Sequence, residues 1–307
     1  MVEQTRGIVR LISRLVLPCI VLFALFDFAA AGLPAASANS AGQVFLFRGI
    51  AGLIFSRGMD QLAEELNQVG VTASVHGFVA CSSVAETAIR AYRQFPSPIT
   101  VVGHSAGGSC ALKFAEMLQA ENIPVSLVIT IDPTRFDQIF DYKLPLNVER
   151  YINVYQSDNI LGGRNVLPER GFRGHYASFD LSDHKEINHI NIDKIESVHE
   201  QLVAKIQQIA VTPANDHGKR VPIHFDVPAD ALIELWDSGM PAFARAGDTM
   251  QTLATIYHVP IWSLTQINQM SDNVVLAKGQ HVVVPRHLVP LAAPGTGAVL
   301  GRTPSMH

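Results

Sequence analysis

The chain has 307 residues, of which 48% are hydrophobic and 16% are charged. This composition provides enough apolar surface for a buried core and excludes a disordered protein, and the length suits one large domain with a smaller one. The formal net charge of −4 provides no basic surface of the kind that nucleic-acid phosphates require, so we expect no nucleic-acid partner.

Residues 1–40 have the layout of a secretory signal. Three arginines precede an apolar run at residues 15–26, and a stretch rich in alanine follows. This segment predicts a signal peptide or a signal anchor, which places the protein in the periplasm, in the cell envelope or outside the cell. The unbroken run is shorter than the roughly 20 residues that cross a bilayer, so contact with a membrane is expected only through a retained anchor.

Two cysteines remain outside this segment, Cys81 and Cys110. Two cysteines exclude a disulfide framework and permit at most one bridge. Isolated thiols are common in protein cores, and we interpret the pair as two separate buried thiols.

Residues 41–210 alternate between the patterns of strands and helices. Apolar runs predict strands, and apolar residues at helical spacing predict amphipathic helices between them. Such an alternation predicts a three-layer α/β domain, in which helices cover both faces of a mostly parallel sheet. The expected strands are 43–49, 72–78, 99–105, 125–133, 150–158 and 175–182, and the expected helices are 59–70, 83–95, 110–118 and 193–209.

The sequence Gly-His-Ser-Ala-Gly at residues 103–107 follows a buried strand and precedes a helix. So sharp a turn forces Ser105 into a strained backbone conformation, and the flanking glycines remove the Cβ clashes that would forbid it. The hydroxyl group then points out of the carboxyl edge of the sheet, beside a helix N-terminus that favours negative charge. In this context residues 43–208 resemble the α/β-hydrolase superfamily, which implies that Ser105 is a catalytic nucleophile. The alternative is a glycine-rich helix cap with an inactive serine.

A serine hydroxyl needs a base that accepts its proton. In the superfamily a histidine that comes after the acid supplies it, and the later candidates are His175, His184, His189 and His199. His189 follows the last expected strand of the domain and precedes its last helix, where the resemblance places the catalytic histidine. We therefore choose His189, with His184 as the alternative.

Two aspartates compete for the role of the acid. Asp132 ends a strand and precedes Pro133, which resembles the Asp-Pro pair of pancreatic-type lipases. Asp158 ends the next strand, where most members of the superfamily keep the acid. An acid that orients an imidazole needs a rigid backbone, and the Asp-Pro turn is the stiffer of the two, so we choose Asp132 over Asp158.

An oxyanion hole needs two backbone N–H groups. The resemblance implies Ala106, directly after the nucleophile, as the first donor. Gly49 allows the loop after the first strand to come close, so Ile50 is the expected second donor. Arg48 stands where the superfamily often has a histidine, which leaves the hydrogen bonds of this loop unpredicted.

The segments 134–149 and 162–176 are expected to overhang this site. The side chains that either line an acyl pocket there or pack against the sheet are Phe136, Ile139, Phe140 and Phe172. The sequence contains no metal-ligand motif and no glycine-rich phosphate loop after a strand, so we expect no metal and no other cofactor.

Proline, glycine and charged residues break every period at 211–240, which predicts a linker. Residues 241–287 then have the pattern of a strand, two short helices and a strand, and they resemble a LysM domain. The tail at 288–307 is rich in glycine, proline and alanine and is expected to be unstructured. The residues that carry the LysM resemblance are Gly247, Asp248, Thr249, Leu253, Ala254, Tyr257, Val259, Leu264, Ile267, Asn268, Gly279, Gln280 and Pro285.

LysM domains bind glycans that contain N-acetylglucosamine, such as peptidoglycan or chitin, in a shallow groove between two loops. The resemblance therefore implies a glycan site formed by Gly247, Asp248, Thr249, Met250, Val274, Val275 and Leu276. Asp248 or Thr249 is also expected to cap the first short helix. The alternative is a packed module that binds no glycan.

Together these patterns predict an exported serine hydrolase, of the esterase or lipase type, that cleaves an acyl ester and is tethered to cell-wall glycan. The alternative is a glycan-binding envelope protein whose α/β domain is an inactive scaffold. A fold on its own does not separate the two, because function depends on the residues of a site.

Overall fold

The computed structural model of the protein describes residues 42–50, 52–134, 143–158, 161, 163–211 and 218–289. The predicted signal segment at 1–40 and nearly all of the predicted tail at 288–307 lie outside these residues. Within the described part of the chain, no helix combines the length and the apolar character that crossing a bilayer requires.

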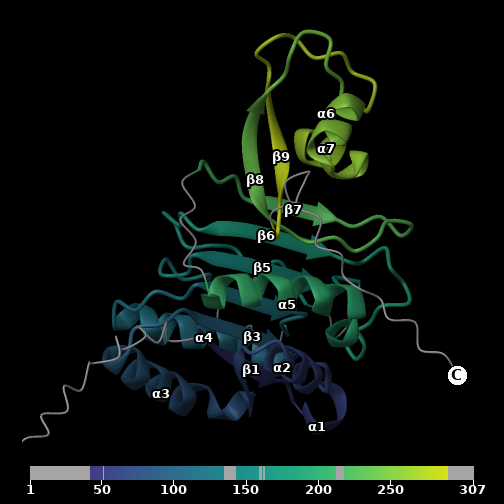
Figure 1. Ribbon diagram of the computed structural model, residues 1–307. Coiled ribbons are helices and arrows are strands. Elements are labelled where there is room, and N and C mark those ends of the chain that lie inside the picture. Colours follow the sequence, from purple (N-terminus) through teal and green to yellow (C-terminus); the bar gives the residue numbers. More distant parts are fainter. Residues whose placement is uncertain are drawn as a thin grey trace, which may run out of the picture. The chain divides into compact units, whose positions relative to one another are not determined.

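One parallel sheet forms the centre of the larger domain, with the strand order β2-β1-β3-β4-β5-β6-β7 (Figure 1). Strands β3 to β6 are buried along their whole length, as expected when helices cover both faces of a parallel sheet. The predicted α/β class is therefore confirmed. The strands are β1 (Gln43–Arg48), β2 (Thr72–Gly77), β3 (Ile99–His104), β4 (Leu127–Ile131), β5 (Arg150–Tyr155), β6 (His175–Asp180) and β7 (Ile223–Asp226).

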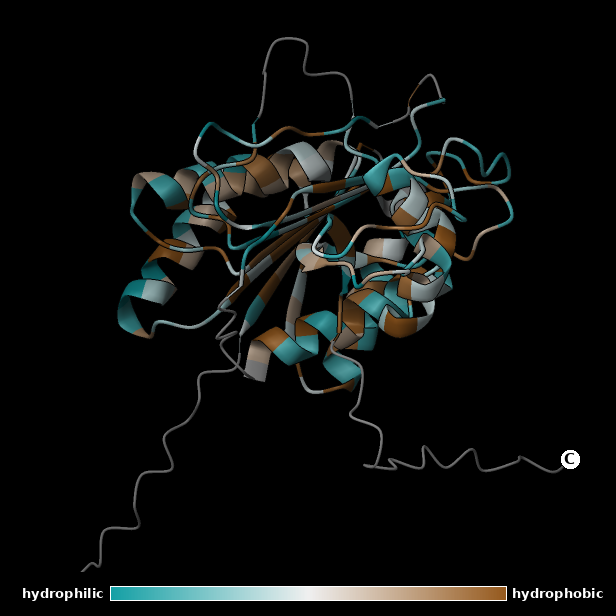
Figure 2. Ribbon diagram, turned by 90° about the horizontal axis from the view of Figure 1, so that it is seen from above, coloured by the Kyte–Doolittle hydropathy of each residue, from teal (hydrophilic) through white to brown (hydrophobic). Residues whose placement is uncertain are grey.

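Two pairs of helices cover the two faces of this sheet, so that it lies between two helical layers (Figure 2). Met59, Leu62 and Leu66 recur at helical spacing in α2, and they join the apolar core of one face together with residues of α5. Helices α3 and α4 contribute to the core of the other face. The helices of this domain are α1 (Gly52–Phe55), α2 (Gly58–Gln68), α3 (Cys81–Gln94), α4 (Ala106–Ala120) and α5 (Glu196–Val211).

The predicted linker at 211–240 contains a strand of the sheet. In β7, Ile223 and Phe225 are buried whereas His224 and Asp226 are exposed, and the strand pairs with β6. An alternation of only four residues among prolines and charged residues is too short to be recognised as a strand in the sequence. The sheet therefore extends beyond the predicted boundary at residue 210.

The C-terminal module has the expected order of elements. Strands β8 (Trp236–Phe243) and β9 (His281–His287) are antiparallel, and helices α6 (Met250–Tyr257) and α7 (Ile261–Asn268) lie between them in the chain. Thr249 caps α6, because its hydroxyl accepts a hydrogen bond from the backbone N–H of Thr252. The module begins earlier than predicted, since the strand starts at Trp236.

Cys81 and Cys110 form a disulfide, which corrects the interpretation as two separate thiols. Cys81 is the first residue of α3, and Cys110 lies near the start of α4. The two helices pack beside each other and bring the Cα atoms to 5.6 Å, a separation that a disulfide spans. A pairing that depends on helix packing leaves no trace in the spacing of the two residues along the chain.

Candidate active site

The turn after β3 gives Ser105 the strained backbone expected for a nucleophile elbow, with φ at 59° and ψ at −128°. A Cβ atom on Gly103 would lie 2.0 Å from the carbonyl oxygen of Gly107, and one on Gly107 would lie 2.1 Å from that of Phe47. Real Cβ atoms do not approach backbone so closely, so both positions require glycine. The glycines permit the tight packing of β3, α4 and β1 on which the position of Ser105 depends.

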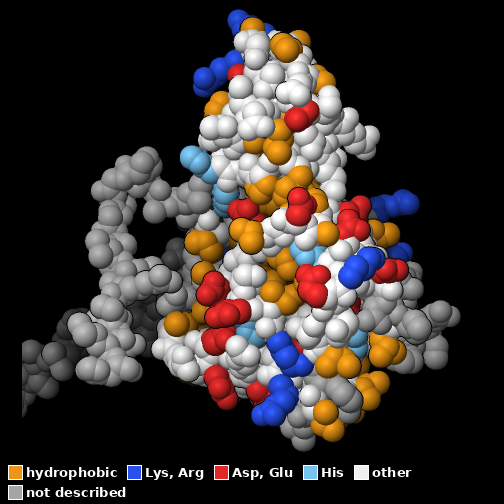
Figure 3. Space-filling model, turned by 90° about the vertical axis from the view of Figure 1, so that its right-hand side faces the viewer, with side chains coloured by type: hydrophobic (Ala, Val, Ile, Leu, Met, Phe, Trp, Pro, Cys, Tyr) orange, Lys and Arg blue, Asp and Glu red, His pale blue; other side chains and the backbone are white. Residues whose placement is uncertain are grey.

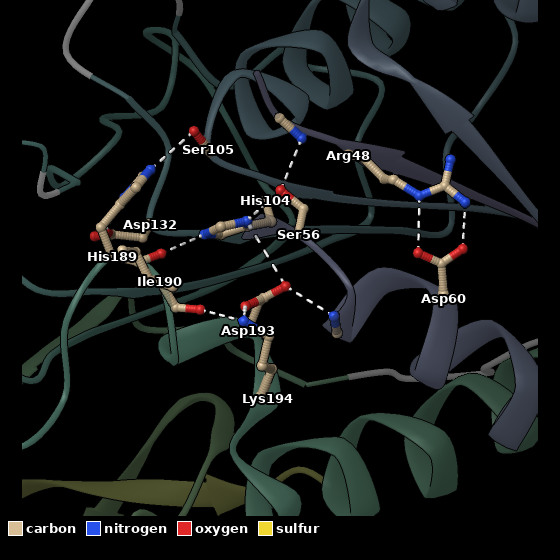
Figure 4. Close-up of polar contacts among 12 residues, drawn as sticks. Arg48, Ser56, Asp60, His104, Ser105, Asp132, His189, Ile190, Asp193 and Lys194 are labelled. Atoms are coloured by element: carbon tan, nitrogen blue, oxygen red, sulfur yellow. Dashed lines mark hydrogen bonds and ion pairs between the residues drawn. The ribbon is translucent and has the colours of Figure 1, made fainter. Parts of the chain in front are cut away.

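Ser105, His189 and Asp132 form a continuous hydrogen-bonded chain (Figure 4). The Nε2 atom of His189 is 2.9 Å from Oγ of Ser105, and its Nδ1 atom is 2.6 Å from Oδ2 of Asp132. Because a carboxylate only accepts hydrogen bonds, Nδ1 carries the proton and donates it. The Nε2 atom of a neutral His189 is then free of hydrogen and can accept the proton of the serine hydroxyl.

The carboxylate group of Asp132 is held in place next to the imidazole ring of His189. The side chain of Asp132 is fully buried, and its Oδ1 atom accepts hydrogen bonds from the backbone N–H groups of Gln156, at 3.0 Å, and Gly163, at 2.5 Å. These two donors fix the carboxylate from the side opposite His189. The structure therefore brings Asp132, and not Asp158, to the histidine.

The alternative acid lies on the surface. The side chain of Asp158 is 62% exposed, and its Oδ2 atom is 2.6 Å from Nζ of Lys185. The hydrogen bond from Lys185 lowers the pKa of Asp158. The carboxylate of Asp158 is thus engaged in a solvent-exposed ion pair, away from the imidazole.

The other candidate histidines have partners elsewhere. His184 lies 3.2 Å from the carboxylate of Glu186. His175 is the first residue of β6, so it lies at the opposite end of the sheet from Ser105, and it is hydrogen-bonded to Ser238. His199 contacts the backbone carbonyl of Asp193. Within the described residues, no group of three or more His, Cys, Asp or Glu side chains is arranged to hold a metal ion.

Both expected oxyanion donors lie next to Ser105. A Cβ atom on Gly49 would be 2.6 Å from Cβ of Ser105, so the backbone of the loop after β1 touches Ser105, and Ile50 follows directly. Ala106 is the first residue of α4. Among the described residues, neither the N–H of Ile50 nor that of Ala106 finds a hydrogen-bond acceptor.

Arg48 supports the loop in a way that the sequence did not predict. Its guanidinium group forms an ion pair with Asp60 of α2, with Nε 2.8 Å from Oδ2 and a second contact from Nη2 to Oδ1 (Figure 4). The backbone N–H of Gly49 donates a hydrogen bond to Oγ of Ser56 at 3.1 Å. These contacts connect the loop to α2 and to the short segment that precedes it.

A second buried network lies beside the first, and sequence reasoning missed it. The Nδ1 atom of His104 is 2.8 Å from Oγ of Ser56, and its Nε2 atom is 2.9 Å from the backbone carbonyl oxygen of His189. Asp193 lies next to it, with Oδ2 3.8 Å from Nδ1 of His104 and 3.0 Å from the N–H of Gly58. His104 is part of the Gly-His-Ser-Ala-Gly sequence at the end of a wholly buried strand, which is the one signal that could have indicated it.

Of the side chains considered for an acyl pocket, Phe136, Ile139 and Phe140 lie outside the described residues. Phe172 precedes β6 and packs against the core, at the amino edge of the sheet and away from Ser105. Other large apolar side chains are exposed where the strands end or beside His189. They are Ile50, Ile54, Val79, Leu161 and Ile190.

The face that lies on the right in Figure 1 is where the parallel strands end. Several groups of hydrophobic side chains are exposed on this side of the molecule, among acidic and basic ones (Figure 3). Parallel α/β sheets bind their ligands outside the carboxyl ends of the strands, so this is the face on which a substrate is expected.

The two loops of the C-terminal module lie side by side, because the N–H of Leu276 donates to the carbonyl oxygen of Asp248 at 2.7 Å. Gly247 has a φ of 88°, which favours glycine, and Val275 is 69% exposed. The side chains of Met250 and Leu276 are buried in the module's core, which corrects their assignment to the groove. These two residues were assigned from their place in a loop, whereas packing decides which side chains face the solvent.

Residues 245–285 match the family of LysM domains. Among solved structures, a proposed hydrolase of the alpha/beta superfamily from Xanthomonas campestris pv. campestris is similar, with 14% sequence identity and a TM-score of 0.28 over 42% of this chain and 75% of that chain. No curated protein matches. The C-terminal module is thus a LysM domain, whereas the α/β class of the larger domain rests on its own strand order.

Proposed function

We propose that the α/β domain is a serine hydrolase that cleaves carboxylic esters through an acyl-enzyme, and that the LysM domain tethers it to a glycan of the cell wall. The observation that carries the proposal is the unbroken hydrogen-bonded chain from Ser105 through His189 to Asp132. Nucleophile, base and orienting acid in such a chain are the parts that acyl transfer requires.

Each member of this chain has a role in the reaction. The Oγ atom of Ser105 attacks the ester carbonyl carbon while Nε2 of His189 takes the hydroxyl proton. The tetrahedral adduct collapses, the bond between the carbonyl carbon and the alcohol oxygen breaks, and His189 gives its proton to the departing alcohol. A water molecule then attacks the acyl-enzyme with His189 again as the base, which releases the acid and restores Ser105.

Asp132 and the two amides act on the charges that develop. The carboxylate of Asp132 holds the neutral imidazole in the productive tautomer and stabilises the imidazolium ion that forms. The N–H groups of Ala106 and Ile50 donate to the oxyanion of the tetrahedral adduct, and removal of one such donor typically lowers kcat by about 10²- to 10³-fold.

The surroundings of Ser105 favour an ester with an apolar group. The exposed side chains of Ile50, Ile54, Val79 and Ile190 belong to the loops and short helices at the carboxyl edge of the sheet or adjoin His189. Burial of such surface against a hydrocarbon chain contributes about 25 cal/mol per Å². We therefore expect esters of medium or long acyl chains to be better substrates than acetates.

The LysM domain supports the second half of the proposal. The exposed loops around Gly247 and Val275 are the place at which an N-acetylglucosamine glycan would bind. A glycan of the cell wall lies outside the cytoplasm, which agrees with the export signal expected at residues 1–40. We therefore expect the protein in the cell envelope or outside the cell.

A fluorophosphonate probe tests the catalytic half, because it labels a serine that a neighbouring base activates. The wild-type protein should be labelled, and Ser105→Ala should not be. The acyl-chain preference follows from the hydrolysis rates of a series of p-nitrophenyl esters. If the wild-type protein remains unlabelled, the hydrolase proposal is wrong, and the alternative of a glycan-binding protein with an inactive α/β domain holds.

Sedimentation with insoluble chitin and with peptidoglycan tests the glycan-binding half. Val275→Asp places a charge in an exposed loop of the proposed groove and should reduce binding at least about tenfold. Ile256→Asp is the matched control, because Ile256 is an exposed residue of α6 outside the two loops. Equal binding by the two variants would contradict the proposed groove.

A further inference from the structure

A buried path of hydrogen bonds connects the two sides of the candidate active site (Figure 4). It begins at the N–H of Gly49, which is 3.1 Å from Oγ of Ser56. It continues from Ser56 to Nδ1 of His104, at 2.8 Å, and from Nε2 of His104 to the carbonyl oxygen of His189, at 2.9 Å. Ser56 and His104 are each 1% exposed, so water does not compete for these contacts.

The direction of every hydrogen bond in this path is fixed. A carbonyl oxygen only accepts, so Nε2 of His104 carries a hydrogen and donates it to His189. Burial lowers the pKa of His104 to about 3, with a smaller contribution from the charge of His189, so the ring is neutral at physiological pH. Its Nδ1 atom then has no hydrogen and accepts the proton of the Ser56 hydroxyl. The oxygen of Ser56 in turn accepts the N–H of Gly49.

The charged groups near His104 do not break this arrangement. The Oδ2 atom of Asp193 is 3.8 Å from Nδ1 of His104, beyond hydrogen-bond distance, and it accepts the N–H of Gly58 at 3.0 Å instead. The Nζ atom of Lys194 is 3.6 Å from the other carboxylate oxygen of Asp193. The ring of His189 lies with its centre 5.0 Å from that of His104.

We propose that His104 is a positioning residue, which as the neutral Nε2–H tautomer sets the distance between the oxyanion loop at Gly49 and the backbone of the general base His189. The inference rests on the proposed function. The loop at Gly49 and the segment at His189 follow different strands, and they must stand on two sides of Ser105 at a fixed separation. A displacement of about 1 Å in such a site can lower the rate about 100-fold.

Substitutions of His104 separate the two halves of the path. In His104→Gln the side-chain amide reaches the place of Nε2 and keeps a donor for His189, but the contact with Ser56 is lost. In His104→Asn the amide occupies the place of Nδ1 and keeps a partner for Ser56, but the donor to His189 is lost. Ser56→Ala breaks the same contact as His104→Gln.

Ser238→Ala provides a matched control. Its hydroxyl is fully buried and lies 2.9 Å from Nδ1 of His175, which is also fully buried, so Ser238 belongs to a second buried serine–histidine pair far from Ser105. The hydrogen bond in this pair has the opposite direction, because Nε2 of His175 accepts from Arg220 and Nδ1 therefore donates to Ser238. Loss of this hydroxyl should lower the thermal stability about as much as Ser56→Ala does. It should leave kcat unchanged, because nothing in the path depends on it.

Steady-state kinetics on a p-nitrophenyl ester are the first readout. We expect kcat to fall at least about tenfold in Ser56→Ala, His104→Gln and His104→Asn, with KM within about twofold of the wild type. The double variant Ser56→Ala/His104→Gln should be no slower than the slower single variant, since Ser56→Ala already breaks the contact with His104 that His104→Gln breaks, together with the hydrogen bond from Gly49. Wild-type kcat in the three single variants, or a kcat loss in Ser238→Ala equal to that in Ser56→Ala, would overturn the role of His104.

The ¹⁵N chemical shifts of the His104 ring provide a readout that does not depend on activity. They should show the neutral Nε2–H tautomer from pH 8 to pH 5. The Nδ1–H tautomer, or titration of the ring within that range, would contradict the inference. A wild-type protein that the fluorophosphonate probe does not label overturns the proposed function as well, whereas a labelled wild type with fully active variants overturns the role of His104 alone.

Discussion

Ser105 and Asp132 occupy equivalent positions, each one residue beyond the end of neighbouring parallel strands. His104 is in register with Ile131, and the N–H of Ser105 donates to the carbonyl oxygen of Ile131 at 3.0 Å. Both residues have positive φ, at 59° and 45°, which is unfavourable by about 1–3 kcal/mol for a residue with a side chain. Their side chains thereby reach the same edge of the sheet, where His189 contacts both.

This relationship predicts which aspartate the reaction needs. Asp132→Asn should lower kcat about 10³- to 10⁴-fold, because the amide favours the wrong imidazole tautomer and does not stabilise the imidazolium ion. Asp158→Asn should keep nearly full activity, since it removes only an exposed ion pair with Lys185. The rates of ester hydrolysis by the two variants decide the matter, and the prediction is wrong if Asp158→Asn shows the larger loss.

The contact between Gly49 and Ser105 predicts a loss of activity in Gly49→Ala. The added methyl group would lie 2.6 Å from Cβ and 2.8 Å from Oγ of Ser105, so the oxyanion loop or the serine must move. We expect kcat to fall at least about 100-fold. In the control Gly77→Ala, the nearest atom would be 3.9 Å away in the side chain of Val79, and activity should be retained. Equal rates for both variants would show that the loop does not support catalysis.

The burial of His104 predicts how stability depends on pH. In the folded state the pKa of His104 is lowered from 6.5 to about 3. Between these pH values His104 is therefore protonated in the unfolded chain and neutral in the folded protein. The free energy of unfolding therefore decreases as the pH falls from 6.5 toward 3, by up to about 1.4 kcal/mol per pH unit. His104→Gln removes this contribution, so the stability of this variant should decrease less on acidification.

Asp193 acts in the opposite direction. Burial raises its pKa from 3.8 to about 6, so the folded protein binds a proton before the unfolded chain does. This contribution to the free energy of unfolding increases as the pH falls from 6 toward 3.8 and is lost as the pH rises. Asp193→Asn should therefore decrease in stability more than the wild type between pH 7.5 and 4.5. Urea unfolding at pH 7.5 and pH 4.5 measures the free energy of unfolding of the wild type, His104→Gln and Asp193→Asn. The same change in this free energy between the two pH values for all three proteins would refute both predictions.

The disulfide predicts a loss of stability on reduction. Cys81 and Cys110 are 29 residues apart, and closure of a loop of this length raises the free energy of the unfolded chain by about 3–4 kcal/mol at 25 °C through lost entropy. The double variant Cys81→Ser/Cys110→Ser should lower the Tm to about that of the wild type in dithiothreitol. Further loss of Tm when the reductant is added to the double variant would show that the effect comes from elsewhere.

Local patterns were sufficient for most of the secondary structure and for Ser105 in the candidate site, whereas the choice of His189 and Asp132 also used a family resemblance. Strands β3 and β4 are mostly apolar runs, and α2 repeats its apolar residues at helical spacing. The sequence of each element therefore predicts whether it is a strand or a helix. The Gly-His-Ser-Ala-Gly turn identified Ser105 because the required glycines are neighbours in the chain. The resemblance to a LysM domain covered a whole module, and the family match at 245–285 confirms it.

The sequence by itself thus determined the α/β class, the LysM domain and the place of the candidate nucleophile, since each depends on residues within one or two elements. Tertiary structure alone decided which aspartate meets His189, that Cys81 and Cys110 pair, and that His104 connects Ser56 to a carbonyl group 85 residues away. Those contacts depend on how separate strands and helices pack and on which way a buried side chain turns. Hydrophobic periodicity along the chain carries no information on either.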